Sequence, residues 1–139
     1  MTSTAQELLA EKAAAIERHL ARVEARLPDA PAVLAPGTDA SDAVVLHLWQ
    51  AVQIAIDLAV STAVRLGEPA PATYAEAFRA LGRRGILPED LVANLARAAG
   101  FRNRLVHAYE GLDLTRVTAA ARTGPADLRA FLACLRDRT

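Results

Sequence analysis

Apolar residues recur at steps of three and four along most of this 139-residue chain, and this spacing constrains the fold more than any other feature. An α-helix completes a turn every 3.6 residues, so the spacing places apolar side chains on one helix face. Alanine and leucine supply much of the apolar share, whereas aromatic residues make up only 4%. Since alanine and leucine favour helices and strands favour β-branched and aromatic residues, the pattern predicts an all-α fold.

Proline and glycine divide the pattern into separate helices. The first helix is expected over residues 5–26, and the proline-rich residues 28–40 are expected to form a connector. A second helix should begin at Ser41 or Asp42, whose side chains can cap free backbone amides, and run to Leu66. It is apolar on more than one side, which is typical of a bundle's central helix or of a dimer interface.

Short polar signals mark the next two helices. Thr73 and Glu76 have the spacing of a capping box, which predicts a short helix to Arg84. Pro88 suits the first turn of the following helix, which should reach Gly100.

Beyond that glycine, the segment to about Glu110 is compatible with continued helix. A last helical region should begin at Leu114 and be broken at Gly124 and Pro125, because proline removes a backbone donor and clashes with the preceding turn. The sum is an antiparallel helical bundle of five or six helices.

The size and charge of the chain limit its function. A mass of 14.8 kDa suits one domain, here residues 1–139. A formal net charge of zero argues against a protein that coats nucleic acid by charge alone, but not against an enzyme that grips a few phosphates. The lone Cys134 excludes an internal disulfide, and neither a signal peptide nor ~18 uninterrupted apolar residues is evident. We therefore expect a cytoplasmic protein that does not enter a membrane.

The strongest chemical signal is the segment from Arg102 to Tyr109, which holds two guanidinium groups, a carboxamide, an imidazole and a phenol. Leu105 and Val106 are expected to be buried and so to anchor the segment to the core. Histidine can move protons near neutral pH, and arginine holds phosphate through a planar fork. Since the RNA 2′-hydroxyl is itself a nucleophile, Arg102 and His107 suffice for RNA cleavage without a metal ion or cofactor.

Arg102 and His107 are five residues apart, or about 140° around an ideal helix, so they are not direct neighbours on one helix. The long arginine side chain can reach across, or the segment can depart from helix near His107. A third arrangement is a dimer in which two copies pool their groups in one cleft.

An arginine, four residues and a histidine, with Asn103 directly after the arginine, resemble the R-X4-6-H signature of the HEPN superfamily of ribonucleases. The ten residues from Gly100 to Tyr109 look like the HepT branch of that superfamily. The resemblance covers about residues 41–118 in good register, whereas the flanking helices agree only in helical character. The upstream segments that agree are Gln50 to Asp57, Tyr74 to Phe78, Gly85 to Pro88 and Leu95 to Arg97.

The resemblance implies an endoribonuclease toxin that acts as a helical dimer and pairs with a minimal nucleotidyltransferase antitoxin, MntA. Arg102 and His107 would then be catalytic, and Asn103 would support them. The antitoxin would transfer AMP from ATP to Tyr109, and the added phosphates would repel RNA and compete for Arg102. The implied partners are RNA, an MntA-like antitoxin and a second copy of the chain.

A non-catalytic interpretation stays open. Arg102 would then pair with a carboxylate, His107 would cap a helix, and the chain would be a binding or substrate subunit of a nucleotidyltransferase. Arg104 and the pair Arg83 and Arg84 either help to hold RNA or are solvated, and the solvated interpretation is favoured for all three.

Three further side chains have structural interpretations. Trp49 is expected in the core or at a dimer interface. His19 lies in a charged helix and is expected at the surface, whereas His47 is expected to be buried or interfacial.

Overall fold

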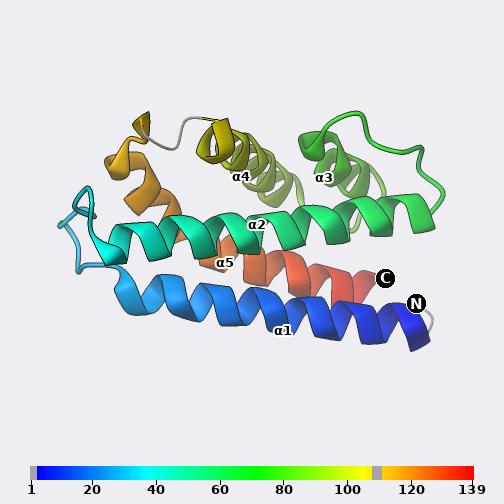
Figure 1. Ribbon diagram of the computed structural model, residues 1–139. Coiled ribbons are helices and arrows are strands. Elements are labelled where there is room, and N and C mark those ends of the chain that lie inside the picture. The colour runs from blue at the N-terminus through cyan, green and yellow to red at the C-terminus, as the bar shows by residue number, and fades with distance from the viewer. Residues whose placement is uncertain (1–2, 108–110) are drawn as a thin grey trace.

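The computed structural model describes residues 3–107 and 111–139, and these residues form five α-helices (Figure 1). No strand occurs among the described residues, so the all-α prediction is confirmed. The helices are α1 Ser3–Arg26, α2 Asp39–Arg65, α3 Tyr74–Arg83, α4 Glu89–His107 and α5 Leu114–Arg138.

The second helix is the centre of the molecule. It contacts each of the other four helices, whereas α1 contacts only α2 and α5. In Figure 1, α1 runs antiparallel to α2 and α5 lies behind them, while α3 and α4 lie along the opposite side of α2. By length and composition α2 could cross a membrane, but half of its most apolar window is buried within the bundle. Its apolar character is therefore accounted for by its central position.

The start of α2 differs from the prediction, and its end agrees with it. Thr38, rather than Ser41 or Asp42, is the N-cap, and its hydroxyl oxygen accepts a hydrogen bond from the Ser41 amide at 3.1 Å. The earlier cap leaves Ser41 buried inside the first turn. Leu66 closes the helix, and Gly67 follows with a φ of 92°, a conformation that glycine adopts at little cost.

The predicted break at Gly124 and Pro125 is wrong, because α5 runs through both residues without interruption. Buried residues continue at helical spacing on both sides of the proline, which is itself buried. Burial of a continuous apolar face against the bundle outweighs the lost hydrogen bond and the crowding that proline causes. The buried residues of this face include Val117, Ala121, Leu128, Leu132 and Leu135.

The proline-rich connector between α1 and α2 is tied to α5. The Leu34 amide donates to the Thr118 hydroxyl at 3.1 Å, and the Leu34 side chain is buried. Arg122 Nη2 donates to the carbonyl oxygens of Pro28 and Ala32 at 2.8 and 2.7 Å. These bonds satisfy one amide and two carbonyl groups of the connector, and they attach the connector to α5.

The expectation for His19 is wrong, because this side chain is half-buried between α1 and α2 rather than at the surface. Its Nδ1 lies 3.0 Å from Nδ1 of the half-buried His47. Burial lowers the pKa of both rings from 6.5, and the positive charge of Arg22 lowers both further. A short bond between two ring nitrogens needs one of them unprotonated, so the packed state favours neutral imidazole.

Candidate functional site

The fourth helix carries the motif segment. It is continuous through Gly100 as far as His107, and its buried Leu95 and Ala99 lie at helical spacing. Leu105 is 3% exposed, which confirms that it anchors the segment to the core. Because the chain is helical up to His107, no departure from helix upstream of that residue brings it towards Arg102.

Two aromatic rings hold the half-buried Arg102 side chain. Its Cζ atom lies 5.7 Å from the centre of the Trp49 ring and 5.4 Å from that of Tyr74. Trp49 comes from α2 and Tyr74 from the first turn of α3, so three helices position one guanidinium group. Cation–π attraction to both rings restricts the movement of the guanidinium group.

Arg102 makes few polar contacts. Its Nη1 donates to Asn103 Oδ1 at 3.3 Å, and its buried Nε has no partner among the described residues. Within residues 3–107 and 111–139, no carboxylate lies within ion-pair distance of Arg102. Over these residues the contacts do not support a structural ion pair, and they leave N–H groups that suit a phosphate.

The other two predicted functional groups are not described. The backbone of His107 belongs to α4, but its side chain lies outside the description, as does all of Tyr109. Their roles as proton-transfer residue and as AMP acceptor therefore stay predictions.

Two more buried polar atoms without partners lie on α2. Trp49 Nε1 and Gln53 Oε1 resemble Arg102 Nε in this respect, among the residues that the structure describes. Gln53 Nε2 donates to Asp57 Oδ1 at 2.9 Å, which leaves the amide oxygen as the unsatisfied end. Buried polar atoms are nearly always bonded, so these three atoms are exceptions within the part of the chain that the structure describes.

The three other arginines that were considered as RNA contacts differ in their surroundings. Arg83 Nη1 lies 2.8 Å from Glu76 Oε1, and Arg84 Nε lies 3.8 Å from Glu68 Oε1, so this pair is engaged with carboxylates. Arg104 is exposed, and its Cζ lies 6.0 Å from the Phe101 ring centre. No group of three or more His, Cys, Asp or Glu side chains with metal-binding geometry occurs in the described part of the chain.

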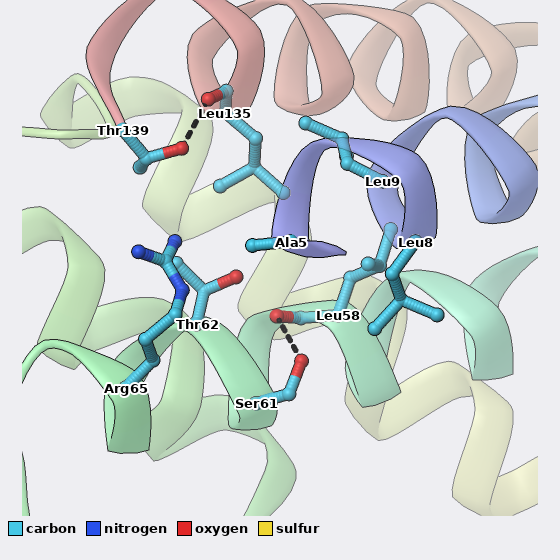
Figure 2. A pocket seen from close by; sticks show the side chains of 9 residues that line it. All are labelled: Ala5, Leu8, Leu9, Leu58, Ser61, Thr62, Arg65, Leu135 and Thr139. Carbon is cyan, nitrogen blue, oxygen red and sulfur yellow. Dashed lines mark hydrogen bonds between the residues drawn. The ribbon is translucent and has the colours of Figure 1, made fainter. Parts of the chain in front are cut away.

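The described surface has a crevice far from the motif and a larger groove beside it. A crevice of about 90 Å³ lies between the start of α1 and the ends of α2 and α5, and Leu8, Thr62 and Arg65 are among the residues that line it (Figure 2). Arg65 is 16 residues from Trp49, which contacts Arg102, so these two α2 residues lie about 24 Å apart along the helix axis. A larger groove of about 550 Å³ borders α4 itself and is lined by residues of α2, α4 and α5.

Trp49 and Tyr74 are the residues that sequence reasoning missed. They precede Arg102 by 53 and 28 positions, and no local spacing connects them to it. Tyr74 is 38% exposed, and its membership of a family-like segment was the only available signal.

The fold and the motif together define a class: an all-α bundle whose fourth helix holds an arginine between two aromatic rings, five residues before a histidine. The family model described as "Ribonuclease HepT-like" matches residues 16–135, and the chain belongs to this family. The expected family and fold are thus confirmed.

Similar proteins agree with this family. A curated relative from Aphanizomenon flos-aquae, named tRNA nuclease HepT, is 38% identical over 68 residues, which are 49% of this chain and 46% of that relative. The match thus spans about half of the relative's length. A tri-AMPylated HEPN toxin of Shewanella oneidensis, solved in complex with an MNT antitoxin, has a TM-score of 0.84 at 23% identity, over 98% of both chains. A toxin–antitoxin structure with AMP-PNP has a TM-score of 0.85 at 22% identity, over 94% of this chain and 98% of the other.

Proposed function

We propose that this chain is a metal-independent endoribonuclease and the toxin of a toxin–antitoxin pair. The observation that carries the proposal is the state of Arg102: half-buried, held between two rings, and without a carboxylate partner among the described residues. A charged group kept in this way suits a phosphate that becomes more negative in the transition state. The family supports the same activity, as does the name of the curated relative.

The chemistry needs only this chain and the RNA. His107 takes the proton of a ribose 2′-hydroxyl, whose oxygen attacks the adjacent phosphorus, and a proton is returned to the leaving 5′-oxygen. Arg102 stabilises the pentacoordinate phosphate, and Asn103 holds one edge of its guanidinium through the 3.3 Å bond. The products are a 2′,3′-cyclic phosphate and a 5′-hydroxyl.

Regulation follows from Tyr109. A nucleotidyltransferase partner would attach AMP to the phenol oxygen, which loses its proton while pyrophosphate leaves ATP. The added phosphate would compete with RNA for the Arg102 guanidinium if the modified tyrosine lies within its reach. The solved Shewanella oneidensis complex, which holds an AMPylated toxin with its antitoxin, supports such a pairing. Because RNA and ATP are both cytoplasmic, a cytoplasmic location is part of the proposal.

The active form would be a homodimer. Three buried polar atoms near the motif have no partner within the described chain, and a second copy can supply partners. Leu46 and Val64 on α2 are 49% and 48% exposed, so this apolar helix is not fully covered by its own chain. A shared cleft would also bring Arg102 of one copy to His107 of the other.

The test is cleavage of cellular RNA after induced expression, with sequencing of the new ends. Arg102→Ala and His107→Ala should each lower the cleavage rate at least about 100-fold, the usual range for loss of an acid–base or charge-stabilising group. Arg79→Ala is the matched control, because Arg79 is an exposed arginine on α3 that pairs only with Glu76 in the described structure. Unchanged cleavage in both motif variants would refute the nuclease proposal.

The same protein preparations distinguish the nuclease from the alternative, a non-catalytic substrate subunit of the nucleotidyltransferase. Incubation with the nucleotidyltransferase and ATP, followed by mass spectrometry, should show AMP on Tyr109 and loss of cleavage. An adduct on a protein that never cleaves RNA would favour the alternative.

A further inference from the structure

The groove of about 550 Å³ between α4 and α5, called here the α4–α5 groove, is not used by the chemistry above. Its volume lies within the ~300–1,000 Å³ range of small-ligand sites. We propose that the α4–α5 groove binds one unstacked nucleotide of single-stranded RNA next to the cleaved phosphate. The proposal rests on the ribonuclease function and assigns part of its substrate recognition to this groove.

The floor of the α4–α5 groove suits a nucleobase. Buried apolar side chains form it, among them Leu48 of α2, Leu95 of α4 and Leu128 of α5. Phe101 lies at the lining and is half-buried, so part of its ring is available. A base offers a flat face of low polarity, and stacking on aromatic side chains is the usual way in which proteins hold single-stranded RNA.

The rim of the α4–α5 groove suits the flanking phosphates. Arg97 and Arg104 line it from α4 and Arg116 lines it from α5, against the single acidic side chain Asp127. This local excess of positive charge stands on a chain whose formal net charge is zero. Arg116 is only loosely engaged, with its Nε 3.7 Å from Asp113 Oδ2. Arginines on both walls match phosphates on both sides of one base.

The carboxylate of Asp127 is expected to face the edge of the base rather than a phosphate. Its Oδ1 accepts a hydrogen bond from Asn94 Nδ2 at 3.2 Å, and its other oxygen has no partner among the described residues. A carboxylate repels phosphate but accepts from the N–H groups of a base edge. Guanine presents two adjacent N–H donors on its Watson–Crick edge, and an ionised carboxylate has acceptor sites on both oxygens, including Oδ1, so Asp127 favours guanine in this groove.

The position of the α4–α5 groove connects it to the motif. Arg104 lies between Arg102 and His107 on α4, three residues from the latter, which is about 4.5 Å along the helix axis. Arg102 and Arg104 lie about 160° apart around the helix, so a strand with one phosphate at Arg102 must pass over the last turn of α4 to leave the next nucleotide in the groove.

Binding is measured by fluorescence anisotropy with two labelled RNAs, UUUGUUU and UUUUUUU, in a His107→Ala background that prevents cleavage. The double variant R97Q/R116Q should weaken binding at least about tenfold. The slope of log K against log salt should fall by about 1.4, since each lost phosphate contact contributes ~0.7 for single strands. The control R18Q/R136Q removes the same charge from two exposed arginines that do not line the groove.

Asp127→Asn tests recognition of the base and keeps an oxygen for Asn94. It should remove the preference for UUUGUUU over UUUUUUU with little change for the second RNA. Equal dissociation constants for R97Q/R116Q and R18Q/R136Q would overturn the proposal. So would unchanged RNA binding with lost binding of the nucleotidyltransferase, because the groove would then be a protein interface. Cleavage by the wild-type chain is measured in parallel, so that a failed nuclease proposal appears as absent cleavage, independently of the groove.

Discussion

Two aromatic rings replace part of the water that the Arg102 guanidinium loses in its half-buried position. The guanidinium lies 5.7 Å from the Trp49 ring centre and 5.4 Å from that of Tyr74. Each contact of this kind is worth about 0.5–2 kcal/mol, which is small beside a transition-state contact but enough to limit rotation of the side chain. The two rings act on the site by positioning Arg102.

Replacing Tyr74 should therefore change catalysis more than folding. Tyr74→Leu should lower kcat about 5- to 10-fold with a smaller change in KM, because the arginine would be less well placed for the transition state. Tyr74→Phe keeps the ring and should retain most of the activity. Steady-state cleavage of a short RNA measures both constants, and equal losses in the two variants would show that the ring does not position Arg102.

At the scale of elements, α3 and α4 approach closely at one glycine. A Cβ added at Gly82 would lie 2.7 Å from Cγ2 of Val92, a branched side chain that cannot move aside easily. Gly100 in α4 has nothing within 4 Å of the same position. Close helix packing therefore requires glycine at position 82 but not at position 100. The site depends on Gly82 because the contact of α3 with α4 brings Tyr74 to Arg102.

Alanine substitution separates the two cases. Gly100→Ala should raise the free energy of unfolding by up to about 1 kcal/mol, since alanine favours helix over glycine. Gly82→Ala should lower it by about 1–2 kcal/mol, because the clash outweighs the same gain in propensity. Urea unfolding measures both, and a stabilised Gly82→Ala chain would mean that the helices separate at little cost.

At the scale of the whole molecule, the histidine pair that joins α1 to α2 is expected to make the free energy of unfolding depend on pH. His19 and His47 lie 3.0 Å apart, and both have a pKa below the ordinary 6.5 because of burial and neighbouring positive charge. As the pH falls past 6.5 the unfolded chain takes up protons before the folded chain does. Their contribution to stability is therefore complete above about pH 6.5 and is lost at lower pH, towards their folded pKa values.

This linkage predicts a loss of stability between pH 7.5 and 5 that the double variant His19→Gln/His47→Gln should reduce. The free energy of unfolding is measured in urea at several pH values. Stopping at pH 5 avoids the carboxylates, including Glu24, whose pKa the hydrogen bond from Arg129 lowers. An equally steep loss in the double variant would assign the effect to other groups.

Local sequence signals predicted most of the helices, and the predictions that failed are those in which packing between helices outweighs a local signal. Helix positions and most helix ends follow from local rules, such as the glycine stop at Gly67 and the threonine cap at Thr73, and these were predictable. The break expected at Pro125 was wrong because burial across the whole bundle overrides a local signal. The same holds for His19, because its charged helix gave no local sign of its contact with His47, which is 28 residues away in the chain.

The sequence by itself determined the all-α fold, the motif from Arg102 to Tyr109 and the family, because helical spacing and a short motif are properties of neighbouring residues. Only the tertiary structure decided that Trp49 and Tyr74 enclose Arg102, and that arginines of α4 and α5 share one groove. Those contacts join residues far apart in the chain, and they exist only once three helices pack against α2.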